Sequence, residues 1–430
     1  MMMLKYIPDM VLPPQSAMKR STMKFMYGND IANPWGTLYG VRPVKRVADM
    51  LRAGADEGEI YRFLREKFEI SDIKIALSIA IARKELELTK TISPNDVAIY
   101  LDIPFCPTKC AYCSFVSMSA DRLKEFAEPY LSAIYQEIDA VSKIVKDLDF
   151  TVRSIYIGGG TPTTLLAIEL DNLLYKLRQS FDTDALWEFT VEAGRPDTIT
   201  EQKLSVMKKH GVTRVSINPQ TIHEKTLLRI GRKHSTEDIY RAVSLAREAE
   251  IPVLNMDVIA GLPGEKLEDF VQTLEAVTAF KPENITIHTM SIKRASRLKE
   301  EAFAPDEENH LEASKMLNFA YPFMEEHHYE GYYLYRQKNT LGNLENTGFC
   351  LEGTACLYNI GMMQELMPIM GIGVGAVTKL LKPGRLERIF NVNDVLEYLN
   401  RQEEMRKRKE YMYEFYEKSL KLHQETEGRN

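Results

Sequence analysis

Three cysteines in one short loop are the side chains of this sequence best suited to chemistry. Cys106, Cys110 and Cys113 have the spacing C-x3-C-x2-C and directly follow a short β-rich run. Such a loop can wrap an iron–sulfur cube, and because most 4Fe–4S clusters are held by four thiolates, three cysteines leave one iron open to a ligand. Zinc would need a fourth ligand, and no histidine lies within twenty residues of the loop. We therefore favour a cluster, with zinc or an accidental grouping of structural cysteines as the alternatives.

The two remaining cysteines do not change that interpretation. The chain has five cysteines, an odd number for a disulfide framework, and Cys350 and Cys356 lie far from the loop in the sequence. Two cysteines are too few to build a second full cluster. We expect Cys350 and Cys356 to be buried or free thiols.

An alternation of strand-like and helix-like segments between Val97 and Thr289 must position the cysteine loop. Each unit has a short apolar run, a loop with glycine, proline or polar residues, and a longer amphipathic segment. The predicted strands are Val97–Ile103, Ser154–Ile157, Glu188–Glu192, Arg214–Ile217, Val253–Ile259 and Asn284–His288. The clearest predicted helices are Leu123–Val145, Leu165–Leu177, Ile239–Ala249 and Leu267–Val277. This pattern predicts an α/β fold with a partial, TIM-like (βα)6 barrel.

The polar residues of this segment occur where the predicted strands end. Chemistry in such barrels takes place at the carboxyl ends of the strands. The residues at those ends are Cys106, Gly158–Gly160, Glu192, Asn218, Gln220, Asp257 and His288. We expect them to share one face of the barrel, with His288 facing a substrate or serving as a core histidine.

The chain is long enough for appendages around the barrel. We predict an N-terminal accessory module at residues 1–93, with helices around Val44–Arg52 and Gly58–Phe68, and the barrel at residues 94–290. Residues 291–430 are predicted to form a C-terminal α/β extension on the substrate side, with a helix near Leu311–Glu326. A terminal helix from about Val395 mixes charges of both signs, which indicates a solvated face.

Composition excludes several classes of protein. The net charge of −6 and the absence of a polybasic tail argue against binding to nucleic acid. The sequence contains no uncharged apolar run long enough to predict a membrane span, and the first twenty residues do not have the pattern of a signal peptide. The expected location is the cytoplasm.

With the cysteine motif in place, the sequence resembles the radical S-adenosylmethionine (SAM) superfamily. Its signature is C-x3-C-x2-C after the first barrel strand, with an aromatic residue before the last cysteine, where this chain has Tyr112. The resemblance implies that the open iron of a 4Fe–4S cluster is chelated by the amino and carboxylate groups of SAM. Reductive cleavage of SAM then gives a 5′-deoxyadenosyl radical, while the protein orients the cofactor and excludes side reactions.

Two further features match the SAM site of that superfamily. Gly159, Gly160 and Thr161 follow the second strand, where missing side chains allow a ligand to approach the backbone closely. They match the loop that binds the amino-acid part of SAM, although a tight βα turn would look the same. Glu192 matches the carboxylate that binds the ribose hydroxyls; an ion pair with Arg195 is the alternative.

A narrower resemblance, from about Tyr100 to Lys379, is to the oxygen-independent coproporphyrinogen III oxidase (coproporphyrinogen dehydrogenase) family, especially its HemZ-type branch. The stretch from Trp35 to Pro43 is similar to the extra N-terminal region of that branch. The resemblance implies that Tyr100 lies beside the SAM sulfonium and that Tyr100 and Glu192 serve catalysis. Residues implied to contact SAM, in part a second SAM molecule, are Gln220, Arg232, Asp257 and Val377. A tied-down loop at Gln220 and an ion pair at Arg232 are structural alternatives.

The family's activity implies a tetrapyrrole substrate. The adenosyl radical abstracts hydrogen from the β-carbon of a coproporphyrinogen III propionate, and loss of carbon dioxide gives a vinyl group in haem biosynthesis. The resemblance also implies an electron donor such as flavodoxin or ferredoxin and a monomeric protein. Cations in the late segments that could bind propionates, or form surface ion pairs instead, are Arg294, Arg297, Arg336 and Lys338.

Two departures from the family pattern bear on the substrate chemistry. Asp102 and Phe115 stand where the best-known members have histidine and a fourth cysteine. One rival function is a haem-binding carrier, but the His-Asn-x-x-Tyr-Trp segment of such carriers has no counterpart around Thr347–Ile360. Another is a radical methyltransferase or a haem-ring-opening enzyme on the same scaffold.

Overall fold

The computed structural model of the protein describes residues 33–38, 40–113, 117–119, 122–291, 307–337 and 340–427. Phe115, Arg294, Arg297 and Lys338, which the sequence singled out, lie outside the described residues.

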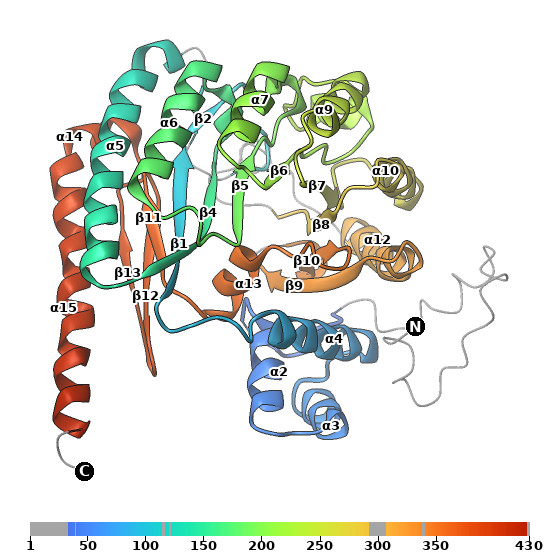
Figure 1. Ribbon diagram of the computed structural model, residues 1–430. Helices are drawn as coiled ribbons and strands as arrows, with labels where there is room; N and C mark the ends of the chain where they lie inside the picture. Colours follow the sequence, from blue (N-terminus) through green and yellow to red (C-terminus); the bar gives the residue numbers. More distant parts are fainter. Residues whose placement is uncertain are drawn as a thin grey trace.

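A row of six parallel strands forms the centre of the described fold and confirms the predicted partial (βα)6 barrel (Figure 1). In spatial order the strands are β1 (Asp96–Ile103), β4 (Thr151–Gly159), β5 (Glu188–Glu192), β6 (Arg214–Ser216), β7 (Val253–Ala260) and β8 (Asn284–Thr289). Each begins and ends within a few residues of its predicted bounds. The helices that follow them are α5 (Leu123–Asp147), α6 (Ala167–Ser180), α7 (Glu201–Lys209), α8 (Glu224–Arg229), α9 (Thr236–Glu248), α10 (Leu267–Ala279) and α12 (Glu307–Glu326).

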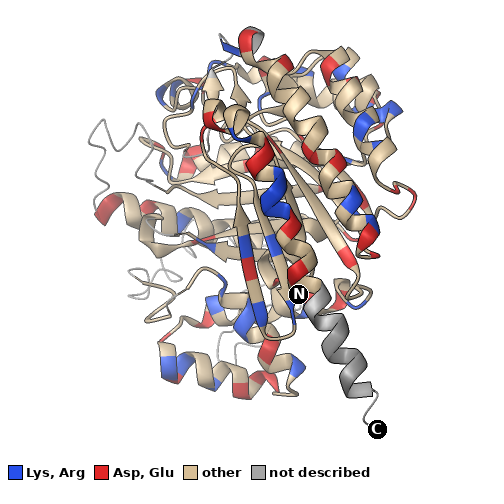
Figure 2. Ribbon diagram, turned by 90° about the vertical axis from the view of Figure 1, so that its left-hand side faces the viewer, with Lys and Arg blue, Asp and Glu red and all other residues tan. Residues whose placement is uncertain are grey.

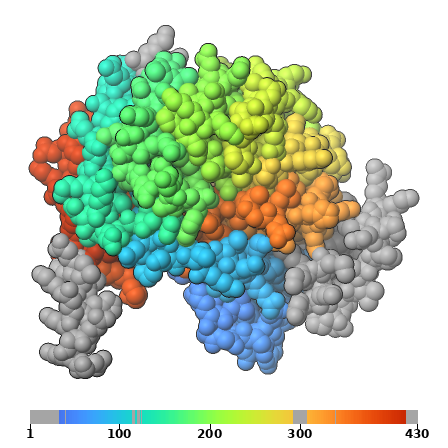
Figure 3. Space-filling model, in the orientation of Figure 1, coloured from blue at the N-terminus to red at the C-terminus, as the bar shows by residue number. Residues whose placement is uncertain are grey.

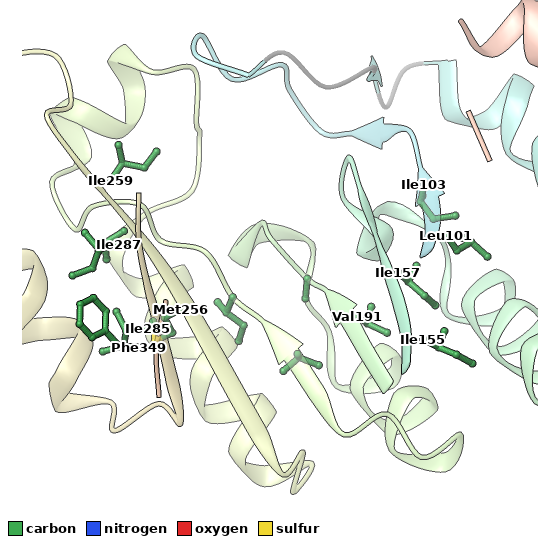
Figure 4. Packing of buried hydrophobic residues seen from close by; sticks show 14 of the residues in the cluster. Leu101, Ile103, Ile155, Ile157, Val191, Met256, Ile259, Ile285, Ile287 and Phe349 are labelled. Carbon is green, nitrogen blue, oxygen red and sulfur yellow. The ribbon is translucent and has the colours of Figure 1, made fainter. Parts of the chain in front are cut away.

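Alternation along these strands separates a polar inner face from an apolar outer face. Side chains that line the central cavity are Tyr100, Tyr156, Glu192, Asn255, Asp257, Thr286 and His288. Their neighbours in the sequence are buried aliphatic residues, among them Leu101, Ile155, Ile157, Val191, Met256, Ile285 and Ile287 (Figure 4). Parallel strands with helices on one side bury that face completely, so the cavity face is the one left for chemistry.

Strands from the C-terminal part extend this row to an eleven-stranded sheet in the described residues. On one side, β11 (Ile369–Ile372) pairs parallel with β1, and β12 (Val377–Lys382) and β13 (Arg385–Phe390) follow antiparallel. On the other side, β10 (Glu345–Cys350) pairs antiparallel with β8 and with β9 (Glu330–Arg336). A short two-stranded sheet, β2 (Phe105–Cys106) and β3 (Met118–Ser119), holds the start of the cysteine loop. Helix α13 (Leu357–Gln364) contributes side chains to the cavity.

Three helices form the N-terminal region: α2 (Pro43–Arg52), α3 (Glu57–Phe68) and α4 (Asp72–Leu88), the last of which was not predicted. Helices α2 and α4 pack against β9, and α3 packs on α4. The blue residues that contain α2 and α3 project from the body of the molecule in Figure 3. A buried carboxylate joins this region to β10, because Glu345 accepts hydrogen bonds from Trp35 Nε1 at 2.6 Å and from Lys74 Nζ at 2.5 Å. The division into modules at residues 93 and 290 stays a prediction.

The C-terminal helices are α14 (Val395–Asn400) and α15 (Gln402–Glu427), and α15 has the predicted solvated face as well as a buried face that was not predicted. Acidic and basic residues are interspersed along its visible face (Figure 2). The opposite face packs on α5 and buries Met405, Lys409, Met412 and Phe415. The Lys409 ammonium lies 3.4 Å from Glu137 Oε1 and donates to Gly371 O. No helix among the described residues has the length and apolar character needed to cross a membrane.

Candidate functional site

A cavity of about 560 Å³ opens at the carboxyl ends of the barrel strands. That volume falls within the range of roughly 300–1,000 Å³ that is typical of small-molecule sites. The residues predicted from the sequence to hold the cluster or to contact SAM all line it: Tyr100, Cys106, Cys110, Tyr112, Cys113, Gly159, Gly160, Thr161, Glu192, Gln220, Arg232, Asp257 and Val377. The structure therefore brings them together, while the role of each stays a prediction.

The cysteine loop is fastened to the segment that follows β6. Ala111 N donates to Ile230 O at 2.8 Å, and Thr108 Oγ1 donates to Gly231 O at 2.7 Å. Gly231 has a φ of 77°, and a Cβ at this position would lie 3.1 Å from Lys109 O, so glycine allows the close approach. The loop is thus held from a second strand of the barrel.

The three thiols of the loop form no disulfide, are partly exposed and line one cavity. Burial raises the pKa of the Cys106 thiol to about 11, although a hydrogen bond from Thr161 opposes this shift. Within the described ranges, no group of three His, Cys, Asp or Glu side chains is arranged around a single metal ion. The cysteines of a 4Fe–4S cube bind different irons at separate corners, so they stand farther apart than the ligands of one ion. A donor set of three thiols fits such a cube with one corner left for a ligand.

The glycine loop after β4 forms a cradle beside this cluster site. A Cβ on Gly160 would lie 3.0 Å from Cys106 Sγ, and a Cβ on Gly159 would lie 2.3 Å from Asp102 Oδ2. Gly159 also has a φ of 98°, which L side chains rarely adopt. Only glycine fits at these two positions, because protein atoms already occupy the space that a side chain would take. Both glycines line the cavity with their backbone.

Glu192 ends β5 as a partly buried carboxylate that lines the cavity. It accepts a hydrogen bond from the Tyr156 hydroxyl and does not pair with Arg195, whose guanidinium lies 3.1 Å from Asp197 Oδ1. The ion-pair alternative for Glu192 is therefore wrong. Burial raises the pKa of Glu192 to about 7, while the Tyr156 hydrogen bond lowers it and the charge of Asp257 raises it further.

Tyr100 and Asp102 lie on the same face of β1, beside the glycine cradle. The Tyr100 hydroxyl donates to Asp102 Oδ2 at 3.2 Å, and Asp102 Oδ1 is buried without a hydrogen-bond partner. Burial raises the pKa of Asp102 well above its ordinary value. Asp102, which stands where the best-known family members have histidine, is thus a buried carboxyl group. It is adjacent to the site but does not line the cavity.

Two polar residues of the cavity have atoms without partners. Gln220 Oε1 is buried and unpaired, while the Gln220 backbone, at a φ of 68°, bridges to Val258. Arg232 Nη1 donates to the carbonyls of Gly194 and Asn218, which leaves Nε without a partner and argues against an ion pair with an acid. Buried unpaired polar atoms are uncommon in folded proteins, so both residues fit contact with a bound ligand.

A hydrogen-bonded row of side chains crosses the cavity wall from β7 to β9. Asn255 Nδ2 donates to Asp257 Oδ1 at 2.8 Å, and Asp257 Oδ2 lies 3.4 Å from His288 Nε2. The other ring nitrogen of His288 lies 3.4 Å from the Tyr335 hydroxyl. Of the two interpretations of His288, the structure supports a residue that faces the cavity.

Sequence reasoning missed the part of the cavity built by the C-terminal region. The missed lining residues include Tyr333, Tyr335, Tyr358, Met362, Met363 and Lys379. Tyrosines at alternate positions in β9 were the available signal for Tyr333 and Tyr335. The prediction for Arg336 is wrong: its guanidinium donates to Leu38 O at 2.8 Å and does not line the cavity.

Comparison with known proteins points in the same direction as this geometry. A model of the radical SAM superfamily matches residues 100–277. The chain is 37% identical to the oxygen-independent coproporphyrinogen-III oxidase-like protein HemZ of Bacillus subtilis, over 97% of this chain and 86% of that protein. It is 27% identical to the heme chaperone HemW of Haemophilus influenzae, over 74% of this chain and 77% of that protein. For HemW of B. subtilis, at 31% identity, the match spans half of that protein's length.

A solved structure has the same fold. Coproporphyrinogen III oxidase (HemN) from Escherichia coli aligns with a TM-score of 0.60 at 20% identity, over 75% of this chain and 72% of that chain. This likeness concerns the fold, while the sequence match to HemZ covers nearly the whole chain. The protein therefore belongs to the radical SAM superfamily and, within it, to the family of the HemZ coproporphyrinogen-III oxidase-like protein.

Proposed function

We propose that the protein oxidatively decarboxylates propionate side chains of coproporphyrinogen III to vinyl groups without oxygen. The observation that carries the proposal is the single cavity. It is lined by the three-cysteine loop, the glycine cradle, Glu192 and several tyrosines. The similarity to a coproporphyrinogen-III oxidase-like protein over 97% of the chain supports the choice of substrate.

Membership of the superfamily implies a 4Fe–4S cluster and SAM. When bound, these cofactors supply a 5′-deoxyadenosyl radical that abstracts hydrogen atoms. Cys106, Cys110 and Cys113 would hold the cluster, and the backbone at Gly159 and Gly160 would lie against the amino-acid part of SAM. Glu192 would accept hydrogen bonds from the ribose hydroxyls, for which it must be ionised.

In this reaction the main task of the protein is to position the substrate and the cofactors. Each propionate loses one hydrogen atom from its β-carbon, one molecule of carbon dioxide and one electron to become a vinyl group, and an external acceptor takes that electron. The reacting carbon must lie within a few ångströms of the radical, and water must be excluded. Tyr156 and Tyr358 stack with ring centroids 4.5 Å apart and offer a flat apolar surface to a tetrapyrrole.

We also propose that Gln220, Arg232, Asp257 and Val377 contact SAM, in part a second molecule. The buried, unpaired Gln220 Oε1 and Arg232 Nε support this proposal. Equilibrium dialysis with radiolabelled SAM counts the molecules bound to the cluster-loaded protein. Two per chain is the expected result, and one per chain would restrict these residues to a single SAM.

The decisive experiment is anaerobic incubation of the cluster-loaded protein with SAM, a low-potential reductant and coproporphyrinogen III. We expect products that lack one and two carboxyl groups, detected by mass spectrometry after oxidation to the porphyrins. Cys110→Ala protein is the matched control and should give none. SAM cleavage without any decarboxylation in the wild type would refute the proposed reaction.

A haem carrier is the second candidate, because 27% identity to a heme chaperone extends over 74% of the chain. Thr347–Ile360 contains neither histidine nor tryptophan to ligate or stack on haem. A haem titration followed by absorbance separates the two functions. Tight stoichiometric binding without turnover of coproporphyrinogen would favour the carrier.

A further inference from the structure

Lys379 places a buried ammonium inside the cavity, and none of the roles given above uses it. It lies in β12 two residues after Val377, and both side chains line the cavity. Thr378, between them, points to the other face of the sheet, where its hydroxyl accepts a hydrogen bond from Lys409. This alternation fixes the direction of Lys379, and the residue is only 8% exposed.

The ammonium group of Lys379 forms only weak interactions for a buried charge. Lys379 Nζ donates to Met362 O at 3.3 Å and contacts the Met362 sulfur. No carboxylate within the described part of the chain forms an ion pair with it. An ammonium has three donors, so one remains for a ligand. Burial, with a smaller contribution from the charge of the nearby Arg42, lowers the pKa of Lys379 to about 8.

Glu365 is the carboxylate that acts electrostatically on Lys379, and it already forms ion pairs with other cations. Glu365 pairs with Arg42, with Lys45 at 2.5 Å and with Arg388 at 3.6 Å. Positive charge is therefore in excess at this end of the cavity. Buried cations in proteins are normally paired with an anion, and the missing anion here has room to come from the cavity.

We propose that Lys379 binds a carboxylate of the substrate and thereby selects tetrapyrroles that carry propionates. The assignment rests on the proposed function and names a residue that determines its specificity. Lys379 pairs with Ile369, which pairs with Ala98 of β1. Ala98 lies five residues before the last residue of β1, which corresponds to roughly 17 Å along the strand from the end that leads into the cysteine loop. A propionate anchored there directs the opposite side of the ring toward the SAM site.

A purely structural role makes a different prediction. Met362 O belongs to the last turn of α13, where a cation interacts favourably with the unpaired carbonyl groups. If Lys379 only capped this helix, its loss would lower stability but would not change the preference for a free acid over an ester. Selectivity between the two ligands therefore distinguishes the roles.

The test compares the binding of coproporphyrin III and of its tetramethyl ester to cluster-loaded, full-length protein. Lys379→Met should weaken binding of the acid by about 10- to 100-fold, the loss expected for one charged hydrogen bond. The same substitution should leave binding of the ester nearly unchanged. Lys379→Arg should stay within a few-fold of the wild type for both ligands.

Lys45→Gln is the matched control, because it removes one positive charge beside Glu365 from a side chain that does not line the cavity. It should bind both ligands as the wild type does. SAM binding, measured in parallel, should be unchanged in Lys379→Met; an equal loss would mean that the carboxylate belongs to SAM and would overturn the assignment.

The remaining outcomes separate the assignment from the proposed function. Equal loss of acid and ester binding in Lys379→Met, or no loss of either, overturns the role of Lys379 alone. If the wild type binds neither porphyrin, the proposed function fails and the assignment fails with it. If Lys379→Met does not fold, the preference of Lys379→Gln for acid over ester provides the same comparison.

Discussion

At the scale of single residues, the three thiols make the sharpest prediction. Cys110→Ala should abolish cluster loading, because two local thiols cannot hold the cube when no fourth cysteine lies nearby in the described residues. Iron and acid-labile sulfide per chain, measured after anaerobic purification, provide the readout. Cys350→Ala, which removes a buried thiol outside the cavity, should load normally. Normal iron content in Cys110→Ala, or zinc in the wild type, would contradict the cluster site.

Glu192 predicts a pH dependence at the same scale. Because burial raises its pKa to about 7, the carboxyl group is ionised above that pH and protonated below it. The ionised form accepts hydrogen bonds from a ribose, so SAM affinity should fall as pH drops through 7, by at most about tenfold per unit. Titrations between pH 6 and 8.5 measure this fall.

The control for that titration is Glu192→Gln, which keeps the shape of the side chain and removes its charge. Its SAM affinity should be low and flat over the same pH range. An equally steep fall in Glu192→Gln would assign the pH dependence to another group. The pH dependence of the stability of the ligand-free protein is an independent check. Because the pKa of Glu192 is higher in the folded than in the unfolded protein, the folded state favours the protonated carboxyl group, and its contribution to stability is lost as pH rises through about 7.

The residues found from the sequence share one property: their signals are local. Cys106, Cys110 and Cys113 stand within one loop, and Gly159 and Glu192 stand where predicted strands end. Tyr358 and Lys379 have no such signal, since they reach the cavity only because α13 packs against β4 and because β11, the neighbour of β12, pairs with β1, both far away in the sequence. The sequence around an isolated lysine in an apolar segment does not indicate which anion the lysine binds.

At the scale of elements, the turn after β4 can be tested by adding one methyl group. In Gly159→Ala the new Cβ meets the Asp102 carboxylate at 2.3 Å and the residue must keep a φ of 98°. Gly384→Ala is the control, with a φ of 72° and open space around its Cβ. Gly384→Ala should cost about 1–2 kcal/mol of unfolding free energy, and Gly159→Ala about 3 kcal/mol or more. Urea unfolding measures both; equal costs would mean that the cradle tolerates a side chain.

Helix α15 supports a second prediction at this scale. Lys409→Met removes the cation that faces the buried Glu137 and leaves that carboxylate without its ion pair. The substitution should lower the unfolding free energy by about 3–5 kcal/mol. Lys407→Met, which removes an exposed partner of Glu403, should change it by less than about 0.5 kcal/mol. Equal effects would show that α15 does not depend on its buried face.

The elements of the barrel could be predicted because each strand and its following helix carry their own periodicity. The place of the C-terminal strands could not, since β10 joins β8 and β11 joins β1 across long stretches of chain. The buried face of α15 did have a signal. Met405, Lys409, Met412 and Phe415 recur at helical spacing, but the dense pattern of charges around them concealed it.

At the scale of the whole molecule, Glu345 joins the N-terminal region to β10 and α12. It is completely buried and binds Lys74 and Trp35 from the N-terminal region and Tyr321 from α12. Glu345→Gln should lower the unfolding free energy by about 3–5 kcal/mol, because the Lys74 ammonium loses its counter-charge. It should also change the fluorescence of Trp35, one of two tryptophans in the chain.

Glu330→Gln provides the matched comparison, because the pair between Glu330 and Lys84 lies at the surface. Its effect on the unfolding free energy should stay below about 1 kcal/mol. If Glu345→Gln were equally mild and left the fluorescence of Trp35 unchanged, the N-terminal helices would be held by their apolar contacts alone.

The parallel pairing of β1 with β11 has a consequence for how the protein is made. The strand that leads into the cysteine loop leaves the ribosome long before β11, so for most of translation one edge of β1 has no neighbour. An unpaired edge invites association with other chains. The strand that carries Val377 and Lys379 follows later still, so the cysteine loop is made well before this part of the cavity wall.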